Sequence, residues 1–337
     1  MTSRERFADV LNFKPVDRLP AIEWATWWDK TLARWYEEGL PEDLSGCADI
    51  GEHLGLDVHR QCWIRPYLPS LLEGKGHGDP VVSSRDDYEK IKPYLYPENA
   101  FDKEVVRCWA HQHKTGDCVV WLTLEGFFWY PRILFGIEPH FYAFYDYPEL
   151  MKEINSDLLT FNKRVVEEFC EITVPDFMTF AEDLSYNHGP MLSKKQFDEF
   201  IAPYYRDILP MLSSKGIVPF VDTDGNVSEP MEWFLNIGVE GFLPLERMAG
   251  VDIAALRQKH PNVKMIGAFD KTVMHLGEDA MRAEFERLLP VMRQGGFIPS
   301  VDHQTPPDVS LDNYKVYVKL LKQYCRVACK DQRGKIE

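Results

Sequence analysis

The stretch Ile217–Leu245, IVPFVDTDGNVSEPMEWFLNIGVEGFLPL, contains one complete strand–helix–strand unit. Residues 217–221 form a short apolar run that is typical of a buried strand, and Gly241–Leu245 form a second one. Between them, Pro230 suits the first turn of a helix and Gly238 suits its end. Two buried strands joined by a helix pair in parallel through a right-handed crossover, so this stretch predicts an α/β fold.

The same unit recurs on both sides of this stretch. Apolar runs predict strands at 118–122, 176–180, 263–266 and 297–300, and helical patterns lie at about 148–170, 193–216, 252–260, 279–293 and from 311 onward. No glycine-rich phosphate loop follows any strand, which weakens the alternative of a doubly wound sheet. We therefore expect a (β/α)8 TIM barrel in one domain over residues 1–337. A capped helix at Thr2 precedes a first strand expected at Ala21–Trp24, and residues 30–115 are harder to assign.

The composition limits the classes of partner. Lys and Arg number 38 against 53 Asp and Glu, a formal net charge of −15, which disfavours binding to nucleic acids and to anionic membranes. The seven cysteines include no CxxC pair, which indicates free thiols in a reducing compartment. No secretory signal and no apolar run of about 20 residues is visible. We expect a cytoplasmic protein, and a homodimer is left open.

Acidic residues follow each of the late predicted strands. They are Glu182 and Asp183, Asp222 and Asp224, Glu246, Asp270, and Asp302, the last followed by His303. In a parallel barrel all these positions open at the carboxyl-terminal mouth, where barrel enzymes keep their chemistry. A single acid after a strand is often only a helix cap, but a succession of five such positions predicts a polar site.

Four of these residues form a candidate metal site. Asp222 and Asp224 are two apart on an extended segment and can point the same way, and Glu246 and His303 would join them at the mouth. Zinc accepts oxygen and imidazole ligands of this kind, and a catalytic zinc keeps one position open. The alternatives are a carboxylate cluster organised by Arg and Lys partners, or one that binds a cationic substrate.

Aromatic residues gather after two of the predicted strands. One cluster is Trp24, Trp27 and Trp28, and the other is Phe127, Phe128, Trp129 and Tyr130. At the mouth of a barrel they would stack on an aromatic substrate or enclose a methylated ammonium group. Packing in the core is an equally good explanation at this stage.

The order of several motifs resembles that of the uroporphyrinogen decarboxylase superfamily, which includes the corrinoid-linked methyltransferases. The matching motifs run nearly from end to end and are clearest from 176 to 320: Thr2–Phe7 with Pro15–Pro20, Gly189–Ser193, Phe197–Tyr205, Val221–Gly225, Gly238–Gly241, Gly295–Ser300 and Pro306-Pro307. The resemblance also implies a (β/α)8 barrel.

Two departures from the family pattern bear on function. The decarboxylases have an Arg-rich segment near the N-terminus that grips the porphyrinogen carboxylates, whereas the matching stretch Glu23–Trp28 contains no Arg. The methyltransferase branch holds zinc with a His-x-Cys pair and a later Cys, whereas here the pair position reads Asp222-Thr223-Asp224 and the last loop offers Asp302-His303. The resemblance without the thiolates implies an O-demethylase rather than a thiol-activating enzyme.

The sequence therefore leads to one main hypothesis. A methyl group would pass from a small methoxylated, aromatic donor to the cobalt of a separate corrinoid (cobalamin) protein, because this chain has no Asp-x-His-x-x-Gly motif of its own. His303, with Glu182 or Asp183, would supply a proton to the leaving oxygen. The expected substrate-binding residues are Glu23, Trp24, Trp129, Tyr186, Asn187 and Asp270.

Two alternatives stay open. In a decarboxylase or another lyase acting on a small carboxylated substrate, His303 and Asp224 would manage protons at the reacting carbon. The third possibility is a ligand-binding barrel without catalysis.

Overall fold

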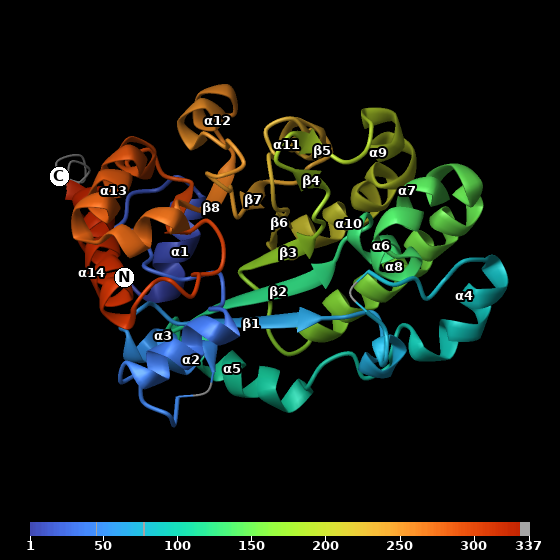
Figure 1. Cartoon of the computed structure of the whole chain (residues 1–337), viewed down its shortest axis with the longest axis horizontal. Coiled ribbons are helices and arrows are strands. Elements are labelled where there is room, and N and C mark those ends of the chain that lie inside the picture. The colour runs from blue at the N-terminus through green and yellow to red at the C-terminus, as the bar shows by residue number, and fades with distance from the viewer. Residues whose placement is uncertain (45, 77, 331–337) are drawn as a thin grey trace.

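The computed structural model describes residues 1–44, 46–76 and 78–330. Seven parallel strands of these residues form one curled sheet in the order β1-β2-β3-β6-β7-β8-β9, with the helices packed around it (Figure 1). Each neighbouring pair in this order is parallel. The arrangement confirms the TIM-barrel-like α/β fold.

The strand expected at Ala21–Trp24 is not a regular strand. This segment occupies the place between β1 and β9 without forming a ladder with either. Asp57 donates its backbone N–H to the Ala21 carbonyl at 2.8 Å. On the other side, Trp24 donates its backbone N–H to Ser300 Oγ at 3.2 Å and its indole N–H to the Val301 carbonyl at 2.5 Å. The barrel is thus closed by an extended segment that we call the seam, residues 19–25.

The late strands lie where the apolar runs predict them, and the first strand does not. The bounds are β1 His59–Ile64, β2 Val119–Glu125, β3 Phe177–Ala181, β6 Val218–Asp222, β7 Gly241–Leu243, β8 Lys264–Phe269 and β9 Phe297–Val301. A short hairpin, β4 Ser185–Tyr186 and β5 Gly189–Pro190, follows β3. Strand β1 has no apolar run because most of its residues are only partly buried.

The helices alternate with the strands. Their bounds are α1 Ser3–Leu11, α2 Asp29–Glu37, α3 Cys47–His53, α4 Arg85–Ile91, α5 Lys103–Thr115, α6 Trp129–Phe135, α7 Ile137–Asp146, α8 Pro148–Cys170, α9 Lys194–Phe200, α10 Ala202–Ser214, α11 Pro230–Leu235, α12 Ile253–Lys259, α13 Glu278–Met292 and α14 Leu311–Val327. Three 3-10 helices are η1 Pro69–Leu72, η2 Lys92–Tyr94 and η3 Lys271–Leu276. The helix expected at 193–216 is two helices that meet at Ile201, because Pro203 has no N–H to continue the hydrogen bonds of α9 and lies instead in the first turn of α10.

Helix α1 covers the amino ends of the strands. The capping box predicted at Thr2 and Glu5 is present. The ring of Phe7 packs on Phe177, the first residue of β3, with ring centroids 5.0 Å apart. Arg4 pairs with Asp176 at 2.7 Å. The opposite, carboxyl-terminal end of the barrel therefore stays open for a site.

The seven cysteines are free. In the part of the chain that the structure describes, no helix combines the length and the apolar character needed to cross a membrane.

Candidate active site

A pocket of about 340 Å³ lies at the carboxyl ends of the strands. Three walls of it are indole rings, from Trp24 on the seam, Trp63 on β1 and Trp129 at the start of α6. Its other lining residues are Ala25, Thr26, Gln61, Trp121, Ala181, Asp183, Asp222, Asp224, His303 and Gln304. A pocket of this size accommodates a small substrate.

The structure brings three of the four predicted metal ligands together. Asp224, Glu246 and His303 each place one ligand atom within 4.8 Å of the other two. His303 Nε2 lies 3.4 Å from an oxygen of Asp224. Burial lowers the pKa of His303, but the hydrogen bond and the charge of Asp224 outweigh it, so the net pKa is raised. We call these three residues the triad.

Asp222 is not part of the triad, although the sequence predicts it as a ligand. Its side chain lines the pocket beside Asp183 and Asp224. Burial raises its pKa well above the ordinary value, and the nearby charges of Asp183, Asp224 and Glu125 raise it further. These surroundings favour the protonated form of Asp222, which suits a proton donor better than a metal ligand.

Asp183 also lines the pocket and has a perturbed carboxyl group. Burial and the charge of Asp224 raise its pKa to about 6. One of its carboxylate oxygens accepts the backbone N–H of Asp224 at 3.2 Å. Its φ of 38° is left-handed, which a non-glycine residue adopts only when its surroundings impose it, often at a functional site.

The triad carboxylates are fixed by neighbours outside the pocket. Glu246 accepts the backbone N–H of Gly225 at 2.9 Å, and Lys271 Nζ lies 3.4 Å from its other oxygen. The buried Asp302 accepts the backbone N–H groups of Arg247 and Lys271 at 2.9 and 3.2 Å. Asp302 therefore fixes the residues that follow Glu246 and the start of η3, and positions the site without entering it.

Glu182 does not reach the pocket, although the sequence predicts a catalytic role for it. Its side chain is completely buried and accepts the backbone N–H groups of Phe127, Phe128 and Trp129 at 3.0, 2.7 and 3.3 Å. It also accepts the hydroxyl of Tyr205 at 2.6 Å. Burial raises its pKa to about 7. Glu182 thus caps the start of α6 and orients Trp129, which is a positioning role.

The other predicted polar contacts lie outside the pocket. Asp270 accepts the backbone N–H and the hydroxyl of Thr272 at 2.9 and 2.6 Å, so it caps η3 instead of binding substrate. Tyr186 and Asn187 are exposed on the hairpin after β3, and neither lines the pocket. Their predicted contact with the substrate ring stays a prediction; the Tyr186 backbone packs on Gly225 and accepts the backbone N–H of Asn226 at 2.9 Å.

The two aromatic clusters divide between pocket and core. Trp24 and Trp129 line the pocket, as predicted for substrate binding, and the Trp24 ring stands edge-on to His303 with centroids 6.5 Å apart. Phe127, Phe128 and Tyr130 are at most 1% exposed and belong to the core. Trp129, the first residue of α6, faces the mouth, whereas Phe127 and Phe128 before it and Tyr130 after it face the core.

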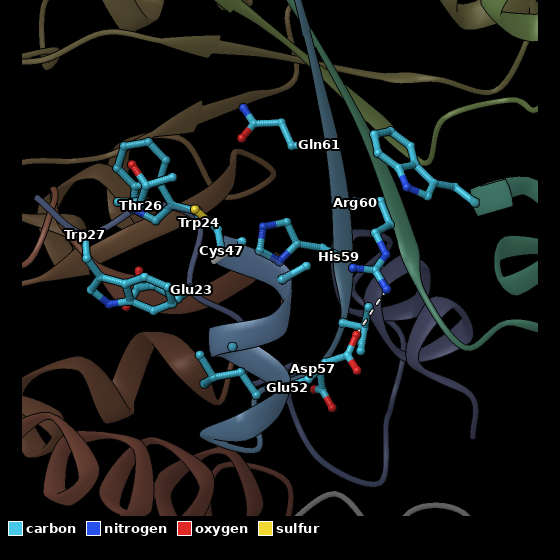
Figure 2. A pocket seen from close by; sticks show the side chains of 17 residues that line it. Glu23, Trp24, Thr26, Trp27, Cys47, Glu52, Asp57, His59, Arg60 and Gln61 are labelled. Carbon is cyan, nitrogen blue, oxygen red and sulfur yellow. Dashed lines mark hydrogen bonds and ion pairs between the residues drawn. The ribbon is translucent and has the colours of Figure 1, made fainter. Parts of the chain in front are cut away.

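Glu23 lies in a second cavity, of about 300 Å³, between the seam and β1 (Figure 2). His59 and Gln61 extend from β1 toward the seam there. The Glu23 carboxyl group accepts the hydroxyls of Ser300 and Tyr314 at 2.6 and 3.2 Å. Glu23 therefore links the seam to β9 and α14. It does not line the pocket that contains Asp224 and His303, which we call the triad pocket and where the sequence predicts it to bind substrate.

Several pocket residues are absent from the sequence-based prediction. Trp63 and Gln61 belong to β1, which has no apolar run, and Trp121 belongs to β2, where only the buried strand is recognisable. Gln61 donates to Thr123 at 2.9 Å, and Trp121 donates to Thr179 at 2.9 Å. The signal that points to Gln61 and Trp63 is their spacing of two, which puts both side chains on one face of a strand.

The triad fits a metal ion of zinc type. It offers two carboxylates and one imidazole, which is the ligand number of a catalytic zinc with one position left open. Lys271 competes for one oxygen of Glu246. A metal would therefore displace Lys271 from Glu246 and would lower the pKa of His303, since a metal ligand must be deprotonated.

Comparisons with known proteins agree with the motifs in the sequence. The uroporphyrinogen decarboxylase (URO-D) family matches residues 134–324. The uroporphyrinogen decarboxylase of Campylobacter lari is 24% identical over 185 residues, which are 53% of this chain and 50% of that protein. The matched part of the chain thus spans about half the length of this curated relative.

Two solved structures are similar at low identity. The B12-independent methionine synthase from Shewanella sp. W3-18-1 in complex with selenomethionine has a TM-score of 0.43 and 11% identity, over 68% of this chain and 67% of that one. The putative vitamin-B12 independent methionine synthase from Listeria monocytogenes has a TM-score of 0.44 and 13% identity, over 93% and 97%. Because the match to the family extends over more than half of its residues, this chain belongs to the uroporphyrinogen decarboxylase family.

Proposed function

We propose that this member of the family is a methyltransferase that takes the methyl group from a small methoxylated aromatic compound and passes it to the cobalt of a corrinoid held by a separate protein. The pocket supports this proposal. The indole rings of Trp24, Trp63 and Trp129 form its walls, and its polar side holds Asp222 and two members of the triad, Asp224 and His303. This combination suits an uncharged aromatic ring that carries an ether oxygen.

The residues of the pocket have distinct tasks in such a reaction. The indoles of Trp24 and Trp129 hold the ring by stacking. As the bond between oxygen and methyl breaks, its electron pair stays on the ether oxygen, which then needs a proton. Asp222, whose protonated form is favoured by burial and by its acidic neighbours, donates that proton and leaves a phenol as product. In the absence of a metal, His303 would be a second proton source, because the hydrogen bond and the charge of Asp224 raise its pKa.

The proposed reaction also involves a metal ion and a corrinoid, neither of which is part of this chain. A zinc ion held by Asp224, Glu246 and His303 would supply Lewis-acid activation of the leaving oxygen. The corrinoid would supply the nucleophile that accepts the methyl group. A pocket of about 340 Å³ suits a small ring compound and is too small for a corrinoid macrocycle, so the partner protein would meet this one at the open mouth.

The proposal is tested with purified protein, cob(I)alamin and a panel of methoxyarenes, followed by the absorbance of methylcobalamin and by chromatography of the phenol. We expect turnover, and a loss of about a hundredfold or more in Asp222→Asn, since a positioned proton donor contributes that much. Asp207→Asn, on the exposed face of α10, is the matched control and should keep full activity. Absence of methyl transfer with every donor, with and without added zinc, rejects the proposal.

Metal analysis separates the two possible states of the triad. If zinc binds, His303→Ala and Asp224→Ala lose it together with activity, while Asp222→Asn keeps it. Asp222→Asn without activity but with a full metal complement would confirm that Asp222 acts on protons alone.

The second candidate is a decarboxylase, and one observation favours it. Asp222 and Asp183 both have raised pKa values and both line the pocket, so they suit protonation of the carbon that loses carbon dioxide. Release of carbon dioxide from a small carboxylated substrate without any cobalt would select this candidate.

A further inference from the structure

A second pocket, of about 370 Å³, adjoins the triad pocket and shares the rings of Trp63 and Trp129 with it. Three cationic side chains line it. Arg65 directly follows β1, Arg132 lies on α6, and Lys75 lies in the loop after η1. We call it the cationic pocket. It is unexpected in a chain whose acidic residues outnumber Lys and Arg by 53 to 38.

None of the three cations forms a close ion pair with a residue described by the structure, although Arg132 lies within the field of Asp183 and Arg65 within that of Glu125. Arg65 stacks on Trp63, 5.9 Å from the ring centroid, and has no hydrogen bond or ion pair within those ranges. Arg132 stacks on Trp129 at 5.0 Å, touches only the Asp183 carbonyl at 3.4 Å, and leaves its Nε buried without a partner. Lys75 reaches only the Pro80 carbonyl at 3.2 Å. Most other cations of this acidic chain are paired, so these three are available to a ligand.

Two acidic residues that also line the cationic pocket limit the charge of the ligand that the pocket can bind. Glu125 accepts the indole N–H of Trp63 at 3.2 Å, and its other oxygen is buried without a partner. Burial raises its pKa to about 7, so part of the population is neutral. Asp79 accepts the backbone N–H of Gly76 at 2.7 Å. Three positive charges against one or two negative ones leave a net positive charge of one or two. A carboxylate is matched over this whole range, whereas a phosphate dianion is matched only while Glu125 is neutral.

We propose that the cationic pocket binds a carboxylate of the substrate, and that the substrate is a methoxylated aromatic carboxylate whose ring lies between Trp63 and Trp129. The methoxy group would then face the triad and Asp222, while Arg65 and Arg132 hold the acid at the other end. Arginine suits this task, because its planar group donates two parallel hydrogen bonds to a carboxylate. This assignment of the substrate class rests on the proposed function.

The test compares acids with their uncharged isosteres. Isothermal titration calorimetry measures the binding of 2-, 3- and 4-methoxybenzoate and of the three corresponding methoxybenzamides to the full chain. We expect at least one acid to bind about tenfold or more tightly than its amide, the effect of one charge-assisted hydrogen bond. Arg65→Gln and Arg132→Gln should each remove that preference and leave binding of the amide unchanged. Arg206→Gln, an exposed arginine of α10 outside both pockets, is the matched control and should behave as wild type.

The outcomes distinguish this proposal from the proposed function. Equal binding of acids and amides, or equal weakening of both by Arg65→Gln, overturns the carboxylate site. If the amides nevertheless transfer their methyl group to cob(I)alamin, the proposed function stands without the carboxylate site. A preference for the acids that depends on Arg65 and Arg132, with no methyl transfer from any of them, supports the carboxylate site and rejects the methyltransferase. Thermal melting of both variants confirms that they are folded.

Discussion

Glu23 is a buried carboxyl group whose role is structural. It is 5% exposed, and burial raises its pKa to about 8, against an ordinary value of 4.5. The folded protein therefore holds a proton on Glu23 between those two values, where the unfolded chain has lost it. Stability falls as pH rises wherever the native state binds more protons, so the carboxyl group destabilises the fold progressively from about pH 4.5 to pH 8.

We predict that Glu23→Gln flattens this dependence. Glutamine can still accept the hydroxyl of Ser300 and does not ionise, so the variant should gain stability relative to wild type as pH rises from 5 to 8. Urea unfolding at several pH values measures the free energy of unfolding of the variant and of wild type. Glu37→Gln, an exposed residue of α2, should leave the profile as it is in wild type. Parallel profiles for wild type and Glu23→Gln would mean that Glu23 is ionised in the fold.

At the same scale, the sequence predicts which residues gather at the mouth but not which way each one faces. Asp224, Glu246 and His303 meet as expected. Glu182 and Asp270 have the same sequence signature, an acid directly after a strand, yet they bind backbone N–H groups at helix starts. Whether such a side chain points into the pocket or toward a helix start depends on tertiary packing, which the local sequence does not determine.

Among the elements, the loop between β2 and α6 matters most for the site. Glu182 can approach its three backbone donors only because residue 126 is glycine: a Cβ at Gly126 would lie 2.2 Å from the Glu182 carboxyl carbon. Because Gly126 has no side chain, the buried carboxyl group of Glu182, which follows β3, can lie against the backbone of this loop. Trp129, which both pockets share, depends on this support.

We predict that Gly126→Ala destabilises the protein and weakens aromatic binding. Overpacking of a filled site typically lowers the free energy of unfolding by about 1–3 kcal/mol. Urea denaturation measures this loss, and methoxyarene titration measures the effect on Trp129. Gly51→Ala, where the added Cβ meets Leu56 at an ordinary 3.9 Å, is the control. Wild-type stability of Gly126→Ala would show that the loop can adjust and that Glu182 is not held by it.

The elements of the carboxyl-terminal half could be predicted closely, and those of residues 30–115 could not. Helix α8 has the predicted bounds, β9 is one residue longer than predicted, and β6 is shifted by one residue at both ends. Their apolar residues are buried in the barrel, which imposes a clear pattern. One face of strand β1, with His59, Gln61 and Trp63, lines cavities instead of packing in the core. This face therefore contains polar residues, and the strand lacks the apolar run by which the other strands can be recognised.

The whole molecule is organised around strands that pair almost in the order of the chain. A cut at about residue 175 would separate β2 from β3 and would break the contacts of Phe7 with Phe177 and of Arg4 with Asp176. Each fragment would expose an apolar strand edge. We therefore propose that the chain folds as one unit.

The corresponding prediction is that residues 1–175 alone are insoluble or unfolded, whereas the full chain unfolds in a single transition. Circular dichroism and calorimetry of both forms test it. A soluble 1–175 fragment with its own cooperative melting would contradict a single folding unit and would place a domain boundary near β3.

The seam has a consequence for the motions of the molecule. Every neighbouring pair of strands in the sheet is joined by a ladder, while the seam is held by the Ala21–Asp57 backbone bond and by contacts of Trp24 and Glu23 with β9 and α14. Local opening between the seam and β1 breaks no ladder hydrogen bonds, so we expect it to require less free energy than the separation of two strands joined by a long ladder. Trp24 belongs to both the seam and the triad pocket, so each such opening also moves a wall of the pocket. We therefore expect the barrel to deform at a wall of the pocket that we propose for the substrate.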